Sequence, residues 1–296
     1  LLILKKREKI SEIEIAKILN VNYGRFRPWK KTNAIPLNFA YKILNNAGIK
    51  IRLDEISALN RGVDIRLTLP NLSPELFKFI AYILGDGHLS KNHVIFNNSN
   101  KKLRREFLIL CKKLFGIKGN EQFPKNRVEK AVFNSRYMSI ILNKVFQIPI
   151  GNKARIIRTP TQLFNMSNKC VSSFLTALYD CESSVGFDEI EFGTTSRYIA
   201  PEICGLLLRF SIVPRLHTRK DSLRIMISGY ENLLKFSKLI GYTHPYKLDK
   251  LDLLLNRPIS RLISNVDLVP NVSKMINSVR TSLNLTQNEL ATNVGV

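Results

Sequence analysis

Apolar residues recur along this chain with two different periods. From 101 to 117 they stand three to four residues apart, which predicts an amphipathic helix. The segment before it, 93–100, is strand-like and ends in polar turn residues, and a second pair of strands is predicted over 120–125 and 128–135. A helical pattern over 136–148 follows. Because an apolar helix also comes before 93–100, the predicted order is helix, two strands, helix, two strands, helix.

The same order of elements begins again near residue 174. After an apolar segment, the pattern predicts a strand over 188–196, a helix over 201–212, strands over 215–220 and 222–229, and a helix over 230–240. Turn serines keep their spacing in both copies: Ser99 and Ser196 lie 13 and 14 residues after the acids that end the two leading helices. The repeat predicts an α+β fold of two pseudo-symmetric αββαββα halves, with small helical flanking segments.

Each half opens with a hydrophobic helix that ends on an acid. The two sequences are "FIAYILGDG" (79–87) and "LTALYDCES" (175–183). In both, two small residues stand four apart on one helix face, namely Ala81 with Gly85 and Ala177 with Cys181. Small residues at this spacing allow another helix to approach closely. We therefore expect the two helices to pack against each other, with their C-terminal ends together.

Such packing brings together the carboxylates of Asp86 and Glu182. Two neighbouring carboxylates repel, and a divalent cation relieves the repulsion. Helix C-termini add carbonyl groups of partial negative charge, here those of Gly85 and Cys181. Oxygen ligands of this kind suit Mg²⁺, for which Mn²⁺ can substitute. The other interpretation is that the two glycines around Asp86 simply end a core helix.

Charge narrows the class of partner. The chain has 46 Lys and Arg against 23 Asp and Glu, a net charge of +23, which is typical of proteins with a polyanionic partner. Nucleic acid is favoured over a membrane surface, because the basic residues are spread along the whole chain. No apolar run approaches the roughly 20 residues that span a bilayer. The four cysteines lack metal-type spacing, which favours reduced thiols and a cytoplasmic location.

The paired acid-tipped segments resemble the two motifs of the LAGLIDADG homing endonucleases, most closely the archaeal, intein-borne members with two motifs in one chain. The resemblance covers roughly residues 66–255. It implies a monomer with internal pseudo-twofold symmetry, whose two antiparallel sheets form a saddle over double-stranded DNA with a long recognition site. It also implies that Asp86 and Glu182 bind the metal. The second motif departs from the pattern at Ser183, where glycine is usual.

The resemblance further implies a catalytic lysine near each acid. Lys153 lies 67 residues after Asp86, and Lys247 lies 65 residues after Glu182. In the family such a lysine polarises water or stabilises the pentavalent phosphate. The alternative is that these are two of many surface lysines.

In the family the sheet residues enter the major groove of DNA. The matching strands and turns here are rich in side chains that reach base edges. The candidate DNA-binding residues are His93, Asn97, Gln122, Lys125, Arg127, Arg215, His217, Arg219, Lys220 and Arg224.

The sequence divides into four segments on these grounds. Residues 63–165 and 166–262 are the two LAGLIDADG halves. Residues 1–62 form an N-terminal helical segment whose start resembles a helix-turn-helix. This segment either contacts DNA or is a small helical domain packed on the core. Residues 263–296 form a C-terminal segment that looks like the start of a truncated helix-turn-helix, with a capping box from Thr286 to Glu289.

Together these features predict a site-specific, Mg²⁺-dependent double-strand DNA endonuclease, a phosphodiester hydrolase. The alternative is a DNA- or RNA-binding protein on the same fold that does not cleave, such as a transcription regulator or a maturase. The presence of both motif acids favours the enzyme. The chain is either excised from an intein or free-standing.

Overall fold

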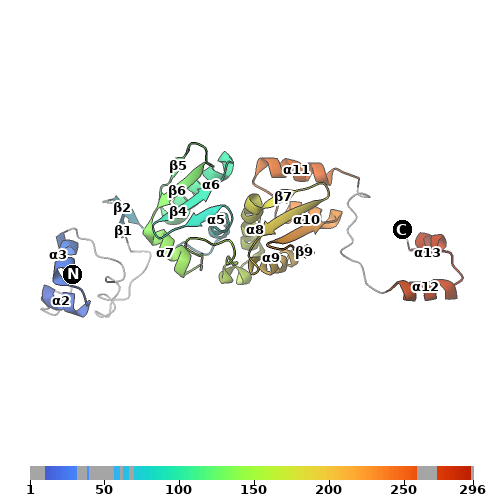
Figure 1. Ribbon diagram of the computed structural model, residues 1–296, viewed down its shortest axis with the longest axis horizontal. Coiled ribbons are helices and arrows are strands. Elements are labelled where there is room, and N and C mark those ends of the chain that lie inside the picture. Colours follow the sequence, from blue (N-terminus) through green and yellow to red (C-terminus); the bar gives the residue numbers. More distant parts are fainter. Residues whose placement is uncertain are drawn as a thin grey trace.

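The structure is a computed structural model and describes residues 11–31, 39, 57–60, 63–66, 70–258 and 272–294. Two units of the same design occupy 70–258, and the leading helix of each lies beside the other at the centre of the molecule (Figure 1). Much of the predicted N-terminal segment, 1–62, lies outside the described residues.

The two units have the same sequence of elements. The first consists of α5 (Pro74–Leu84), β3 (Gly87–Leu89), β4 (His93–Asn97), α6 (Lys101–Phe115), β5 (Asn120–Gln122), β6 (Lys130–Asn134) and α7 (Arg136–Lys144). The second, after a short helix η2 (Thr161–Asn165), consists of α8 (Asn168–Glu182), β7 (Ser183–Val185), β8 (Glu189–Thr194), α9 (Ile199–Leu208), β9 (Arg215–Thr218), β10 (Leu223–Ser228) and α10 (Tyr230–Leu239), followed by α11 (Pro245–Leu255). The predicted α+β fold of two αββαββα halves is confirmed.

Each unit has one antiparallel sheet of four strands, in the orders β3-β4-β6-β5 and β7-β8-β10-β9. In the first sheet Phe96 lies between Gly87 and Ala131, and in the second Phe192 lies between Ser183 and Ile225. Phe96 and Phe192 are 96 residues apart, as are Asp86 and Glu182. The first two strands of the two sheets therefore correspond with an offset of 96, and the equivalent residues Ala131 and Ile225 of the next strand are 94 apart.

The helices cover one face of each sheet, and the alternation of the strands explains why. Val94 and Phe96 of β4 are fully buried, while the residues between and beside them are not. Ile190 and Phe192 of β8 repeat this pattern. Phe107 of α6 stacks on Phe79 of α5 with ring centroids 4.6 Å apart. The hydrophobic core thus lies between sheet and helices, and the opposite sheet face is free for polar side chains.

Local sequence fixes both ends of α5. Ser73 is the N-cap, its hydroxyl accepting from the amide of Leu76, and Pro74 occupies the first turn. At the other end β3 folds straight back against the last helical turn. A Cβ at Gly87 would lie 2.4 Å from the Cα of Ile83, so this sharp reversal requires glycine.

The flanking segments carry short helices and one hairpin. On the N-terminal side are α2 (Glu12–Ile18), α3 (Tyr23–Lys31) and the paired strands β1 (Ser57–Asn60) and β2 (Val63–Arg66), and on the C-terminal side are α12 (Ser273–Ser282) and α13 (Gln287–Asn293). Both α2 and α13 begin with a capping box. Within the described residues, every helix is too short or too polar to cross a membrane.

Candidate active site at the helix junction

Helices α5 and α8 pack along their length, and their C-terminal ends meet. Gly85 closes α5, with its amide donating to the carbonyl of Ala81. A Cβ at Gly85 would lie 2.6 Å from the Cβ of Cys181. The expected close approach of the small residues therefore occurs, and it brings the two motif acids to one place.

Asp86 is the more firmly held of the two acids. Its Oδ2 accepts a hydrogen bond of 2.7 Å from the Nδ2 of Asn98, and its carbonyl accepts from the amide of Asn97. Burial raises the pKa of the Asp86 carboxyl, while hydrogen bonds from Asn98 and Cys181 partly oppose this increase. The sequence marks Asn98 only as a further side chain able to reach a base edge, and its hydrogen bond to Asp86 is revealed by the structure.

Glu182 is the last residue of α8 and is exposed. The protein around its carboxylate nevertheless displaces enough water to raise its pKa, and the negative charge of Asp86 adds to the increase. Within the described residues its carboxylate has no hydrogen-bond partner comparable to Asn98. The two acids thus share a site but differ in how firmly they are oriented.

The two predicted lysines occupy equivalent places. The Nζ of Lys153 donates to the carbonyls of Leu84 and Gly85 at the end of α5. The Nζ of Lys247 donates to the carbonyls of Tyr179 and Asp180 at the end of α8, at 3.0 and 2.6 Å. Both lysines therefore cap a helix C-terminus beside the acids.

Burial gives Lys153 unusual acid–base properties. It lowers the pKa of the ammonium group to about 8, although the negative charge of Glu182 and the neighbouring Cys181 and Asp86 opposes the decrease. Burial also lowers the pKa of Lys247. Amines held in this way exchange protons near neutral pH more readily than surface lysines do.

The donor set at the junction fits a hard divalent cation. The described residues contain no group of three or more His, Cys, Asp and Glu side chains able to hold a metal. The protein therefore supplies two carboxylates. The Gly85 carbonyl, which is predicted from the sequence as a further ligand, instead accepts a hydrogen bond from Lys153. Mg²⁺ is commonly bound by one or two carboxylates together with water and a substrate phosphate. The residues present match this mode and do not form a closed protein cage.

A second acid of α8, Asp180, holds a residue that contacts the first unit. It is fully buried and accepts hydrogen bonds from the amides of Thr243 and His244, both at 2.9 Å. Thr243 also accepts from Lys78 of α5. Burial raises the pKa of Asp180 to about 6. Asp180 is not among the site residues predicted from the sequence, although an acid inside the apolar pattern of α8 is visible in the sequence.

His244 makes a second polar link between the units. Its Nε2 lies 3.3 Å from the Nδ2 of Asn100, the residue that caps α6. Ser183, which replaces the usual glycine of the second motif, donates to the Tyr179 carbonyl and lies 2.8 Å from the Tyr242 hydroxyl. The departure at Ser183 therefore changes the local hydrogen bonding at the end of α8 and leaves Glu182 in place.

The predicted DNA-binding residues fall into two groups. On the sheet faces opposite the helices lie His93, Asn97, Gln122, Arg215, His217 and Arg224. In the exposed turns between the last two strands of each sheet lie Lys125, Arg127, Arg219 and Lys220. None of the ten contributes to the acid pair, so the structure separates a candidate binding surface from the candidate catalytic centre.

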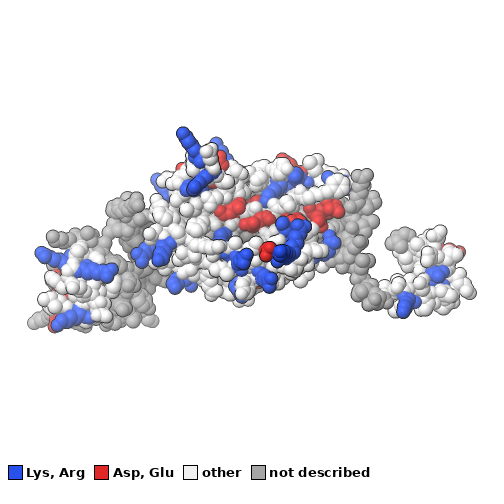
Figure 2. Space-filling view, in the orientation of Figure 1, with Lys and Arg blue, Asp and Glu red and all other residues white. Residues whose placement is uncertain are grey.

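The two sheet faces differ in charge. Among the described residues, the first face carries no acid and includes Lys130, which the sequence analysis does not single out. The second face carries Glu189 and Glu191, which form ion pairs with Arg215 and Arg224. Figure 2 shows acidic side chains in a band across the centre of the visible surface, beside clustered basic ones. The surface of this basic protein is therefore not uniformly positive.

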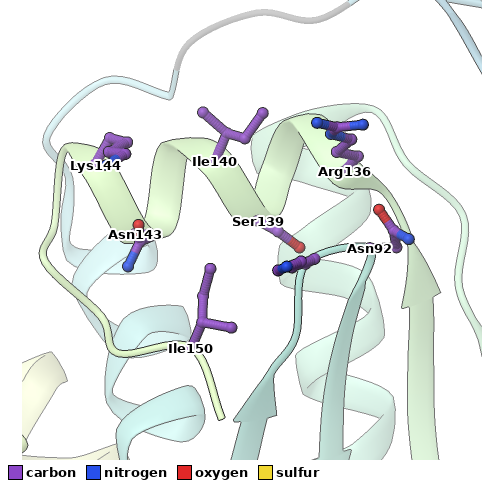
Figure 3. Close-up of a pocket in the computed structure, with 8 residues that line it drawn as sticks. Asn92, Arg136, Ser139, Ile140, Asn143, Lys144 and Ile150 are labelled. Atoms are coloured by element: carbon purple, nitrogen blue, oxygen red, sulfur yellow. The ribbon is translucent and has the colours of Figure 1, made fainter.

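A separate pocket of about 400 Å³ opens beside α7. Figure 3 shows Arg136 and Lys144 at opposite ends of this helix, with Ser139 pointing toward the turn at Asn92 and Asn143 on the side of Ile150. Lys91 completes its basic lining, which includes no acid. The chemistry fits contact with a phosphate and offers nothing to hold a metal.

Comparison with known families supports the interpretation of the second unit. Residues 169–241 match the family model described as a LAGLIDADG-like domain. This span runs from α8 to the end of α10 and includes Glu182. Residues 169–241 are thus similar to a LAGLIDADG-like domain, and the first unit repeats the order of elements of this span.

Individual relatives share only part of their length with this chain. A glutamine–fructose-6-phosphate aminotransferase of Methanocaldococcus jannaschii is 31% identical over 62% of this chain and 18% of its own length. Replication factor C small subunits of M. jannaschii and Thermococcus kodakarensis are 32% and 31% identical, over 60% and 67% of this chain and 10% and 24% of their own lengths. The chain therefore spans about a tenth to a quarter of these curated relatives.

Solved structures with a similar path include I-DmoI in complex with DNA and Mn, with a TM-score of 0.46 and 13% identity over 58% of this chain and 98% of that one. Full-length DUF199/WhiA from Thermatoga maritima gives a TM-score of 0.43 and 17% identity over 73% of this chain and 69% of that one.

Proposed function

We propose that this chain is a homing endonuclease: a site-specific, divalent-metal-dependent enzyme that cuts both strands of double-stranded DNA. One observation carries the proposal. Two helices of matching sequence end side by side, each ends on an acid, and each end is capped by an equivalently placed, half-buried lysine. A plain helix stop explains the glycines around Asp86, but it does not explain why this constellation occurs twice at one junction.

Each residue then has a chemical role. Asp86 and Glu182 hold the cation, which when bound would lower the pKa of water and neutralise charge on the scissile phosphate. Lys153 and Lys247 lie against the helix ends beside the acids, where an ammonium group stabilises a pentavalent phosphate or takes part in proton transfer. One acid and one lysine per unit suit one cut per strand.

The surfaces around the junction suit a long duplex. Each unit presents a four-stranded sheet face with side chains that read base edges, and basic turns flank these faces. Two such faces on a single chain allow a monomer to contact a long site with pseudo-twofold symmetry. The helix pair α2–α3 adds a further candidate contact, because Arg25 and Arg27 of α3 are exposed while Phe26 is buried against α2.

The relatives favour a mobile origin for this segment. Related stretches of 196, 212 and 277 residues occur in an aminotransferase, a replication factor and a DNA helicase, whose names describe unrelated activities. A segment that recurs as a small part of unrelated proteins behaves like an insertion. This supports an intein-associated, cytoplasmic endonuclease.

The proposal is tested by incubating the chain with a library of long duplexes and Mg²⁺ or Mn²⁺ and sequencing the cut ends. We expect cleavage at one long sequence, with both strands cut. Glu182→Gln or Asp86→Asn should block or strongly slow cutting, because each removes a charged metal ligand without changing the side chain's shape. Glu231→Gln on the exposed surface of α10 is the matched control and should cut like the parent.

Full-rate cutting of both strands by both acid variants would show that these carboxylates are not the catalytic pair. Specific binding of duplex without any cleavage in either metal would favour the alternative, a non-cleaving DNA- or RNA-binding protein. Binding of structured RNA in preference to duplex DNA would point to a maturase.

A further inference from the structure

The outer face of the second sheet carries two acid–arginine pairs that a purely phosphate-binding surface does not need. The Nη1 of Arg224 on β10 contacts the Oε1 of Glu191 on β8. The Nη2 of Arg215 on β9 lies 3.1 Å from the Oε2 of Glu189. All four side chains remain partly accessible, at 24 to 40%. They are therefore in position to meet a ligand that covers this face.

The first sheet shows that these pairs are not a requirement of the fold. With the offset of 96 residues between β4 and β8, Glu189 and Glu191 correspond to His93 and Ile95. Arg224 corresponds to Lys130 by pairing, because Lys130 lies opposite Asn97 and Arg224 lies opposite the equivalent Gly193. Both sheets thus present a cation at the same position, but only the second places a carboxylate beside it. Among the described residues, Lys130 has no ion-pair partner.

Gly193 makes room for the pair. It lies opposite Arg224 in the sheet, and a Cβ there would be 2.8 Å from the Arg224 Nη1. The guanidinium therefore lies across β8 at the glycine and reaches Glu191 two residues away. The Nε of Arg224 has no hydrogen-bond partner within the described residues, so the ion pair does not use every N–H donor of the Arg224 guanidinium group.

A carboxylate on a DNA-facing surface has a distinct effect on binding. It cancels the attraction of its arginine for phosphate, because the pair has little net charge. It also accepts a hydrogen bond from the exocyclic amino group of cytosine in the major groove, while arginine donates to the O6 and N7 of guanine. Opposite a base edge that presents only acceptors, the carboxylate finds no donor and its burial is penalised.

We propose that Arg224 and Glu191 form one base-reading unit that makes contact by the second half conditional on guanine and cytosine, with Glu191 as the specificity-determining residue. The inference rests on the proposed function, since it assumes that this face meets duplex DNA. We therefore expect the base pairs that β8 and β10 of the second half contact to be rich in G·C pairs. The first half, with Ile95 and unpaired Lys130, is expected to tolerate more bases at its equivalent positions.

The test is a binding selection with the full chain, in EDTA to prevent cleavage, on a library of random long duplexes. The parent is expected to select guanine and cytosine at adjacent positions of one half-site. Glu191→Gln, which keeps the side chain's shape, should lose the cytosine preference by about tenfold at one position. Its affinity for random duplex should rise, with a salt dependence steeper by about one phosphate contact. Glu231→Gln removes the same charge from α10 and should change neither property.

The outcomes separate this inference from the proposed function. A parent that selects a specific site, together with a Glu191→Gln variant of identical base preference, would overturn the role of Glu191 and leave the endonuclease intact. Loss of preference at positions scattered over both half-sites would also overturn it. A parent that binds no duplex at all would overturn the proposed function itself and this inference with it.

Discussion

Single residues at the helix junction divide into those that the sequence reveals and those that need the fold. Asp86 and Glu182 are visible because each ends an apolar helix at the same point of a repeat. Asn98 becomes a partner of Asp86 only through the antiparallel pairing of β3 with β4, which brings residues 12 positions apart into contact. Within the described part of the chain, the counterpart of Asn98 in the second unit makes no such hydrogen bond to Glu182. The two acids therefore differ in how firmly they are oriented, although their motifs match.

Asp180 is predicted to make the stability of the protein depend on pH. Burial raises its pKa in the folded state to about 6, from an ordinary value of 3.8. The folded state therefore binds this proton more tightly than the unfolded state, and the resulting stabilisation is lost as pH rises from about 4 to about 6. In Asp180→Asn this loss is absent. Between pH 4 and 7 the free energy of unfolding of the variant should improve relative to the parent by about 2 kcal/mol.

The measurement is urea unfolding of both proteins across this pH range. The exposed acid Asp188, changed to Asn, serves as the control and should follow the parent. Parallel pH profiles for Asp180→Asn and the parent would show that Asp180 titrates normally in the folded protein.

At the scale of elements, α5 and α8 were predictable and the short strands were not. A helix of 11 or 15 residues shows its period several times, whereas β3 and β7 have three residues each, too few for any period. The ion pair of Arg224 with Glu191 joins residues 33 apart, and only the register of β8 and β10 places them on one face. Acids on the candidate binding surface therefore escape a sequence analysis that looks for basic residues.

The close contact of α5 with α8 yields a prediction about glycine. Gly85→Ala would place a Cβ 2.6 Å from that of Cys181, and relieving this overlap means moving the two helix ends apart. We expect a loss of about 1–3 kcal/mol in the free energy of unfolding, together with reduced activity because the acids separate. Gly205→Ala in α9 is the control. Nothing lies within 4 Å of its Cβ, so it should stabilise the protein by up to about 1 kcal/mol. Equal effects of the two changes in thermal unfolding would contradict this account of the junction.

The helix pair α2–α3 yields a second prediction at this scale. Ile15, Leu19 and Phe26 are buried together, and Asn20 makes the turn in a left-handed conformation. The exposed Arg25 and Arg27 then project from the second helix, as expected for a helix that contacts DNA. Changing both to alanine should weaken duplex binding and reduce its salt slope by about two. The cleavage position should stay the same.

Salt titration of binding checks this prediction, with the exposed Lys238→Ala of α10 as the control for lost charge. An unchanged slope in the double variant would assign α2–α3 to packing alone, the other role left open by the sequence.

At the scale of the whole molecule, the two units are joined by more than hydrophobic packing. Lys78 of the first unit contacts Thr243 of the second, and Asn100 lies beside His244. These polar links surround the junction, while the sheet faces extend outward on both sides. The repeat in the sequence predicts two equivalent units. The units nevertheless differ in how firmly each acid is oriented and in the charge of the sheet face. These differences become visible only when equivalent strand positions of the two units are compared.

This arrangement predicts that metal removal stops catalysis without unfolding the protein. The helix C-termini at the junction are already capped by Lys153 and Lys247. Burial raises the pKa of Asp86 and Glu182, and the positive charge of both lysines opposes this increase. The protein's own side chains therefore supply part of the charge compensation at the junction, unlike small domains whose fold depends on metal ligands. With EDTA, cleavage should cease and specific duplex binding should persist, while the melting temperature should change by less than about 3 °C relative to protein in Mg²⁺. Calorimetry and gel-shift assays on the same preparation measure both properties. Unfolding on chelation would mean that the acid pair requires a cation to fold, and that the lysine caps alone do not hold the two units together.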